Sequence, residues 1–407
     1  VTVSLSCDDG SGSGCANTYY CIDDSNTCTP TTAGTSVDVT CASGSVCQKY
    51  VRFYSEDNLG NTETTTATNL IKIDKQAPTT TDNAPTGWQT APFSFTLTPS
   101  DGSGSGVSST AFRIDGGDWN ANTTVWITTD GNHQVDYNST DNVGNVESTH
   151  TIWVALDAVA PTTTDDHNAG WQTIDQNVHL TCSDTTSGCD IIQYRIDGGA
   201  WQTYDPATGI LFTTDGNFQL DYNARDVAGN IETTKTVWIA VDKTPPTTTD
   251  NSDTSWHATN QTITLTPSDA TSGVATTYYC IDTSGTCTPN ITGTSVTTVC
   301  ADGDVNTQYV RYYSVDNAGN SEAIKTSNLI KIDKQKPATS WDGNHNTWQN
   351  FDANIHLTCD DFSGSGCSTT MYRLDTDSSS SVSYGSWQTY DTNILITQDG
   401  NWAIDFN

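Results

Sequence analysis

The heptapeptide Asp226-Val-Ala-Gly-Asn-Ile-Glu232 has three counterparts in this 407-residue chain with the same spacing of Asp, Gly, Asn and Glu. They are Asp57-Asn-Leu-Gly-Asn-Thr-Glu63, Asp141-Asn-Val-Gly-Asn-Val-Glu147 and Asp316-Asn-Ala-Gly-Asn-Ser-Glu322, and successive copies lie 84, 85 and 90 residues apart. A fixed period of this length is typical of tandem domains. Only five of the 48 acidic residues are Glu, and four of these end the heptapeptide, so this Glu has a repeated role.

The residues around each copy alternate between apolar and polar side chains, as β-strands with one buried face do. Val178-His-Leu-Thr-Cys182 and Phe218-Gln-Leu-Asp-Tyr222 show this period of two, and Thr236-Val-Trp-Ile-Ala-Val241 is rich in β-branched and aromatic residues. Asp197-Gly-Gly and Asp215-Gly-Asn are signals of tight hairpin turns. Helical periodicity is absent over any useful length. We therefore predict an all-β fold, a linear tandem array of immunoglobulin-like β-sandwich modules.

Short proline-bearing segments separate the repeats and predict the domain boundaries. We expect five modules, over residues 1–78, 79–161, 162–246, 247–337 and 338–407. Such short, proline-stiffened junctions favour a semi-rigid rod over beads on a flexible string. Aligned with the other repeats, module 1 begins after the segment of the first strand and module 5 stops before its last strand. We expect either a longer chain or a strand from a neighbouring subunit to complete them.

The repeats are of two types. Modules 2, 3 and 5 (type B) carry an Arg and, further along, an Asp, whereas modules 1 and 4 (type A) have Cys and Arg at these two positions. Because the Arg and the Asp are lost together, we predict neighbouring strands with cross-strand ion pairs, each contributing about 0.2–1 kcal/mol if exposed. The predicted pairs are Arg113–Asp136, Arg195–Asp221 and Arg373–Asp405, and the replacing residues are Cys21 with Arg52 and Cys280 with Arg311.

Three of these patterns together resemble a known group of proteins. Tyr194-Arg-Ile-Asp-Gly-Gly-Ala-Trp201, the Asp-Gly-Asn turns and the heptapeptide are similar to the Ig-like repeats of bacterial and archaeal cell-surface proteins, including a class once labelled an outer-membrane β-barrel domain. The resemblance covers essentially the whole chain and implies a stalk, an adhesin or a filament on a cell surface. Modules 1 and 4 depart from it, because a Cys loop replaces the Arg-Gly-Gly section.

The heptapeptide allows two interpretations. In one it is a calcium site, with oxygen donors from Asp and Glu, joined by acids of an upstream loop (Asp8/Asp9, Asp101, Asp184 and Asp269) or of the module junctions. In the other it is a hairpin, in which Asp caps the turn, Gly adopts positive φ and Glu binds the backbone or a nearby Lys. No cofactor is required, and Ca²⁺ is the candidate ion. The candidate metal-ligating residues are Asp57, Asn61, Glu63, Asp141, Asn145, Glu147, Asp226, Asn230, Glu232, Asp316, Asn320 and Glu322.

Twelve of the thirteen cysteines form close pairs without His partners, which favours local disulfides over zinc ligation. Disulfides persist mainly outside the cytosol, so an extracellular, cell-surface location is expected. The predicted pairs are Cys7–Cys15, Cys21–Cys28, Cys41–Cys47, Cys182–Cys189, Cys280–Cys287 and Cys359–Cys367, and Cys300 has no partner by this pattern. The sequons of Asn122, Asn138, Asn260 and Asn290 are candidate N-glycosylation sites.

Composition excludes several functions. The formal net charge of −33 and the 15 Lys and Arg leave no basic stripe for nucleic acid. There is no run of 18 apolar residues, so we expect no membrane span, and no leader segment is recognised. Tryptophans recur at fixed module positions, Trp88, Trp171, Trp256 and Trp348 at one and Trp119, Trp201 and Trp387 at another, which favours core or junction packing over a sugar-binding platform.

Catalytic motifs are missing from the sequence. Neither a nucleophile elbow, nor a His-Glu-x-x-His pair, nor a phosphate loop is present, and acid pairs such as Asp8/Asp9 and Asp360/Asp361 belong to Gly/Ser turns. We therefore expect no enzyme, but a structural subunit of an extracellular filament or rod that joins copies of itself end to end by strand complementation. The alternative is a calcium-stiffened adhesin or stalk that presents a tip outside this sequence to cell-surface glycans or proteins.

Overall fold

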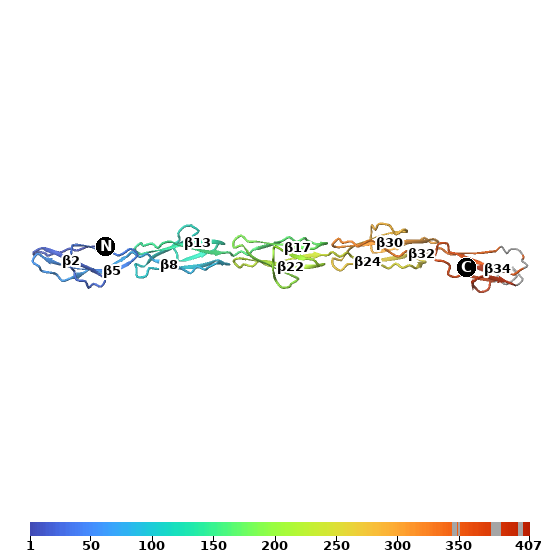
Figure 1. Cartoon of the computed structure of the whole chain (residues 1–407), viewed down its shortest axis with the longest axis horizontal. Helices are drawn as coiled ribbons and strands as arrows, with labels where there is room; N and C mark the ends of the chain where they lie inside the picture. The colour runs from blue at the N-terminus through green and yellow to red at the C-terminus, as the bar shows by residue number, and fades with distance from the viewer. Residues whose placement is uncertain (344–347, 349–350, 376–383, 398–401) are drawn as a thin grey trace.

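The computed structural model describes residues 1–343, 348, 351–375, 384–397 and 402–407. The modules follow one another in a line, so that the chain forms a rod and its order in sequence is its order along the rod (Figure 1). All regular elements of the described residues are β-strands. No helix in this part of the chain is long and apolar enough to cross a membrane.

Module 3 shows the sandwich architecture clearly. One sheet has the strand order β16-β23-β22-β19-β20, and the second layer consists of the pairs β15–β18 and β17–β21. β16 runs parallel to β23, and the other pairs of the module are antiparallel. Its strands are β15 (Thr162–Asp165), β16 (Trp171–Gln172), β17 (Gln176–Val178), β18 (Leu180–Ser183), β19 (Cys189–Ile196), β20 (Gln202–Thr203), β21 (Ile210–Phe212), β22 (Gly216–Asp226) and β23 (Lys235–Val241).

The two layers of module 3 enclose the core that the alternating sequence predicts. Leu220 of β22 and Val241 of β23 have no exposed surface, and Ile239 retains 1%. They pack against Val178 and Leu180 of the opposite layer. Each such side chain stabilises the module by about 1.5–3 kcal/mol through burial.

The other modules repeat this plan with small differences. Module 2 has β8 (Thr79–Asp82), β9 (Trp88–Gln89), β10 (Phe93–Ser100), β11 (Val107–Ile114), β12 (Thr124–Ile127), β13 (Gly131–Asp141) and β14 (His150–Leu156). Module 4 has β24 (Thr247–Asp250), β25 (Trp256–His257), β26 (Gln261–Ser268), β27 (Val274–Asp282), β28 (Ile291–Thr292), β29 (Ser295–Thr298), β30 (Val305–Asp316), β31 (Lys325–Thr326) and β32 (Ile330–Asp333).

The described residues of each terminal module form seven strands, as those of module 2 do. Module 1 has β1 (Thr2–Ser4), β2 (Cys15–Asp23), β3 (Thr32–Ala33), β4 (Ser36–Asp38), β5 (Val46–Asp57), β6 (Thr66–Ala67) and β7 (Ile71–Asp74). Module 5 has β33 (Ala338–Trp341), β34 (Ala353–Ile355), β35 (Leu357–Asp360), β36 (Met371–Asp375), β37 (Gln388–Thr389), β38 (Ile394–Ile396) and β39 (Ala403–Phe406). Each of the five hydrophobic clusters draws its residues from one predicted module. The boundary residues themselves stay a prediction.

The strand registers confirm the cross-strand pairs. In the type B modules an Arg lies opposite an Asp, with Nε–Oδ2 distances of 2.9, 2.8 and 2.8 Å, in Arg113–Asp136, Arg195–Asp221 and Arg373–Asp405. In the type A modules a Cys lies opposite an Arg, in Cys21–Arg52 and Cys280–Arg311. There the Arg donates instead to a backbone carbonyl of the Cys loop. In type B modules the guanidinium therefore binds a carboxylate, and in type A modules it binds a backbone carbonyl.

Candidate cation centres at the module junctions

The heptapeptide forms the turn that leaves the long strand β22 and its counterparts β5, β13 and β30. The carboxylate of Asp226 accepts hydrogen bonds from the backbone amide and the side-chain amide of Asn230, both at 2.8 Å. Gly229 has a φ of 106°, a conformation that favours glycine. The same pair of bonds from the Asn occurs in the other three copies. The structure thus contains the turn that the hairpin interpretation predicts.

The Asn of the heptapeptide also joins two modules. Its side-chain amide donates to the backbone carbonyl of an Asp at the end of the preceding module. The donor–acceptor distances are 3.2, 2.8 and 2.8 Å, in Asn145–Asp74, Asn230–Asp157 and Asn320–Asp242. Asn61 of module 1 donates to Asp57 of its own turn. Sequence reasoning did not assign the Asn this bridging role.

The Glu of the heptapeptide binds backbone amides inside its own module. Glu147 accepts hydrogen bonds from the backbone amides of Thr80 in β8, at 2.6 Å, and of Ser139 in β13, at 3.1 Å. Glu232 and Glu322 bind the first strands of modules 3 and 4 in the same way, and Glu63 binds the amide of Ser55. These are the backbone contacts that the hairpin interpretation predicts for the Glu, and a role of the Glu in ion binding stays a prediction.

Antiparallel pairing brings three segments to one end of a module: the acidic loop, the heptapeptide and the last Asp of the preceding module. In module 3 the acidic loop precedes β19 and the heptapeptide follows β22, and Cys189 lies opposite Asp226, so both are at the same end. Asp157 reaches this end because β15 starts there, with Thr162 opposite Ser183. A register shift, typical of a β-bulge, adjoins this place in β2, β11, β19 and β27.

Three clusters of carboxylates result, each with one junction Asp, one loop Asp and one heptapeptide Asp. Within a cluster, one carboxylate oxygen of each residue lies within 4.8 Å of the others. The junction and heptapeptide residues of the second and third clusters are at most 2% exposed. Of the predicted ligands, the clusters contain the heptapeptide Asp, joined by both the loop acids and the junction acids, and the Asn side chain is hydrogen-bonded to the heptapeptide Asp and to the backbone carbonyl of the junction Asp. The clusters are Asp74/Asp101/Asp141, Asp157/Asp184/Asp226 and Asp242/Asp269/Asp316.

Each cluster gathers three carboxylates at short range without a compensating cationic side chain in the described part of the chain. Among the described residues, none of the nine carboxylates takes part in an ion pair. Burial by itself raises the pKa of Asp141, but hydrogen bonds from Asn145 and from the amides of Val143 and Gly144 outweigh it and lower the pKa below its usual value. Asp141 is therefore ionised at neutral pH, and negative charges at such short range repel one another.

The structure contains the six predicted disulfides, Cys7–Cys15, Cys21–Cys28, Cys41–Cys47, Cys182–Cys189, Cys280–Cys287 and Cys359–Cys367. Three of them, in modules 1, 3 and 5, close the acidic loop; Cys182–Cys189, for example, encloses Asp184. Cys300 is free and buried, and burial raises the pKa of its thiol. Strand register places Asn306 where module 1 has Cys47.

The acid pairs outside the clusters serve the loop backbone. Asp8 accepts a hydrogen bond from the amide of Gly10, and Asp9 from that of Gly14. Asp360 and Asp361 bind amides of their own turn in the same way. These contacts are those of turn acids.

The second set of recurrent tryptophans covers the Arg–Asp pairs on the surface. Guanidinium carbons lie 5.1, 4.8 and 4.6 Å from the ring centroids, in Arg113–Trp119, Arg195–Trp201 and Arg373–Trp387. These rings are 37–44% exposed, so the prediction of core packing was wrong for them, because each ring binds the cationic guanidinium of an Arg outside the core. Trp88, Trp171 and Trp256 instead lie half-buried in the short strands β9, β16 and β25.

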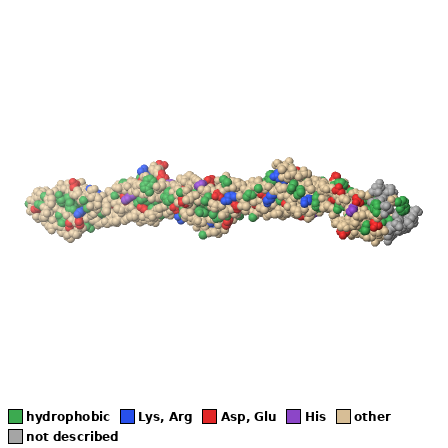
Figure 2. Space-filling model, turned by 45° about the vertical axis from the view of Figure 1, so that its right-hand side comes forward, with side chains coloured by type: hydrophobic (Ala, Val, Ile, Leu, Met, Phe, Trp, Pro, Cys, Tyr) green, Lys and Arg blue, Asp and Glu red, His purple; other side chains and the backbone are tan. Residues whose placement is uncertain are grey.

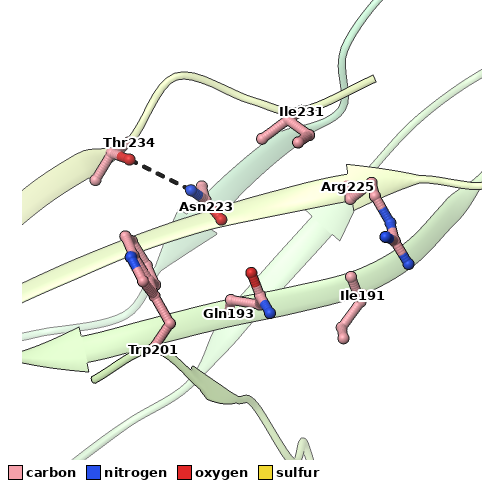
Figure 3. Close-up of a pocket in the computed structure, with 7 residues that line it drawn as sticks. All are labelled: Ile191, Gln193, Trp201, Asn223, Arg225, Ile231 and Thr234. Atoms are coloured by element: carbon pink, nitrogen blue, oxygen red, sulfur yellow. Dashed lines mark hydrogen bonds between the residues drawn. The ribbon is translucent and has the colours of Figure 1, made fainter. Parts of the chain in front are cut away.

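A groove of about 330 Å³ lies beside Trp201 on module 3. Figure 3 shows that its lining side chains come from β19, from β22 and from the segment before β23, and that Asn223 and Thr234 are hydrogen-bonded across it, at 3.3 Å. Arg225 at its rim is already paired with Asp190. The groove is therefore an open surface feature next to an aromatic ring, and its charged side chain is engaged by the module itself.

The four sequons lie in different surroundings. Asn122 and Asn290 are exposed in loops, Asn138 is half-buried within β13, and the side chain of Asn260 accepts a hydrogen bond from the amide of Cys300. Figure 2 shows Lys and Arg as isolated spots along one face of the rod, among acidic and apolar side chains.

Comparison with known proteins yields fold similarity only. No protein-family model and no curated protein matches the chain. Among solved structures it is similar to a D1–D4 ectodomain fragment of ICAM-5, with 9% identity, 81% of this chain and 98% of that chain covered, and a TM-score of 0.35. It is also similar to fibronectin(III)-like modules of Clostridium thermocellum CbhA, with 16% identity, coverage of 40% and 94%, and a TM-score of 0.24. At these values the similarity says nothing about function.

Proposed function

We propose that this chain is a structural subunit of an extracellular rod or filament, built from Ig-like modules of the kind found on bacterial and archaeal surfaces. The six disulfides support a location outside the cytosol. The linear order of the modules supports a spacer or scaffold (Figure 1). The turn-bound acid pairs give no support to catalysis, so no enzymatic activity is proposed.

The observation that carries this proposal is the repeated construction of the junctions. At each of four junctions the side chain of the last Asp of one module accepts a hydrogen bond from a Ser amide in the acidic loop of the next, at 2.6–3.0 Å, in Asp74–Ser105, Asp157–Ser187, Asp242–Ser272 and Asp333–Ser365. The same Asp also binds the amide two residues on, which fixes the start of the linker. A flexible linker would not need these contacts.

Electron microscopy of the native material tests the proposal. Straight rods, or helical polymers built from them, are the expected images. Coiled or globular particles in the same preparation would contradict a structural rod.

Strand complementation is the proposed way in which copies join. In module 3, β22 pairs with β19 on one side and β23 on the other, whereas β39 of module 5 pairs among the described residues with β36 alone. A strand from a neighbouring copy is the partner proposed for the second edge of β39. Polymers that dissociate when an excess of a synthetic peptide with the sequence of β23 is added would support this mode, and polymers that resist the peptide would count against it.

The alternative proposal is a calcium-stiffened stalk that presents an adhesive tip outside this sequence. The three carboxylate clusters at the junctions favour it, since they lie where stiffness is set. Cell-surface glycans or proteins are the partners proposed for such a tip, and glycans on the exposed Asn122 and Asn290 would protect the stalk. Single tapered rods in the micrographs, without polymers, would favour the stalk over the filament.

A further inference from the structure

We propose that three of the module junctions are binding sites for one divalent cation each, of the Ca²⁺ class, and that the ligands come from both modules. Each site combines the last Asp of one module with the loop Asp and the heptapeptide Asp of the next: Asp74/Asp101/Asp141, Asp157/Asp184/Asp226 and Asp242/Asp269/Asp316. The sites deepen the proposed rod, since they supply its stiffness, but the evidence for them is separate.

An unpartnered buried oxygen points to a ligand at the first site. Asp101 is 8% exposed and its Oδ2 accepts a hydrogen bond from the amide of Gly106, but its Oδ1 is buried without any partner among the described residues. The hydroxyl of Ser105, in the same loop, is likewise buried and unpartnered. Buried polar oxygens normally have a partner, and a buried carboxylate oxygen needs a donor or a cation.

The spacing and the chemistry of the donors fit calcium. Two oxygens on opposite sides of a Ca²⁺ ion lie about 4.8 Å apart, because Ca–O distances are about 2.3–2.6 Å. The carboxylate oxygens of each cluster lie within 4.8 Å of one another, so one ion can touch all three. Neither His nor Cys belongs to the clusters, which disfavours zinc and copper. Magnesium usually keeps several waters and binds through one or two carboxylates, so a set of three protein carboxylates favours calcium.

Acidic loops of two different lengths place their Asp in equivalent carboxylate clusters. At the first site the acidic loop runs from Asp101 to Gly106, and the missing Cβ of Gly104 makes room for the carboxylates, since a Cβ there would lie 2.5 Å from Asp101 Oδ2 and 2.7 Å from Asp74 Oδ2. At the second site the loop is one residue shorter, and Asp184 Oδ1 accepts from the amide of Gly188. The loops differ in length, but the cluster of three carboxylates is present at both sites. This is expected if the cluster itself binds the ion.

A bound ion would connect three segments at once: the end of one module, and the loop and turn of the next. Without it, the charges of a cluster repel one another across the junction. Calcium is therefore expected to straighten the junctions and to raise the unfolding temperature, whereas chelation is expected to loosen the junctions without unfolding the modules.

Calcium titration of the full chain, freed of metal with EDTA, tests the assignment. Isothermal titration calorimetry with Ca²⁺ alone is expected to give about three ions per chain. D184N, a change in a half-buried loop residue, is expected to lower the number to two, and D226N to do the same with a different ligand. D57N is the matched control, since Asp57 forms the same turn but joins no cluster of three among the described residues, and three ions are expected.

Absence of saturable binding, or an unchanged stoichiometry in D184N and D226N, would overturn the assignment. Small-angle scattering of the same samples separates this outcome from failure of the rod. An extended particle that binds no calcium would leave the proposed function standing and remove the sites. A particle that binds three ions but stays flexible would support the cation sites and contradict the proposed rod.

Discussion

Removal of Glu147 tests the role of the heptapeptide Glu as a link between two strands of one module. In Glu147→Ala the backbone amides of Thr80 and Ser139 lose their acceptor, and so does the hydroxyl of Thr80. Thr80 is 5% and Ser139 1% exposed, so water reaches neither amide easily. Each buried donor left without a partner costs about 1–3 kcal/mol. The hydroxyl of Thr80 keeps Ser139 as a partner, so the two amides dominate. We expect a loss of about 3–4 kcal/mol.

Differential scanning calorimetry measures this loss. The melting temperature of a module of this size falls by about 4–8 °C for each kcal/mol of lost stability. Module 2 is therefore expected to unfold in a separate transition, about 15–30 °C below the other modules. Glu63→Ala is the matched comparison, because among the described residues the exposed Glu63 accepts from one backbone amide, that of Ser55, instead of two, and about half the effect is expected. Equal shifts in both variants would refute the reasoning. A calcium stoichiometry lowered by one in a folded Glu147→Ala would show that Glu is a ligand after all.

Three further predictions concern the other recurring contacts. Cys182→Ser with Cys189→Ser is expected to cost module 3 about 2–3 kcal/mol in denaturant unfolding and to weaken calcium binding at one site of three. Arg195→Ala removes an ion pair and a ring contact, with an expected loss of about 1–2 kcal/mol and a change in tryptophan fluorescence. Hydrogen bonds, first that from Thr151, hold the pKa of Asp136 below its usual 3.8. The stability that the ionised Asp136 contributes to module 2 is therefore complete above pH 3.8 and is lost as the pH falls through the lowered pKa. The melting temperature is expected to stay level from neutral pH down to about pH 4 and to drop below it.

Much of the fold follows from comparing the repeats with one another. Joint loss of the Arg and the Asp in two modules predicted the opposition of Arg195 and Asp221, because only paired strands explain why the two residues change together. Close spacing of cysteines predicted six disulfides, since a short loop limits the choice of partner. Such internal comparison replaces some of what a set of related sequences would give.

The candidate site was less accessible from sequence. Asp226 and Glu232 recur six residues apart, a pattern compatible with a common ion or with a hairpin. In the structure Gly229 has the positive φ of the hairpin turn, and Glu232 binds the first strand of its own module. The third carboxylate of the cluster, Asp157, belongs to a different module, and the sequence offered the junction acids only as an alternative to the loop acids. Its approach depends on how two sandwiches meet, and no local pattern encodes this. The linking role of Asn230 was missed for the same reason.

The central claim is that Asp and Asn contacts at the junctions hold the modules in line. Small-angle X-ray scattering of the chain in excess calcium tests it most directly. Five modules with strands of about ten residues, end to end, predict a narrow rod with a maximum dimension of about 150–200 Å. A distinctly shorter maximum dimension, with the broad distance distribution of modules on flexible linkers, would contradict the claim.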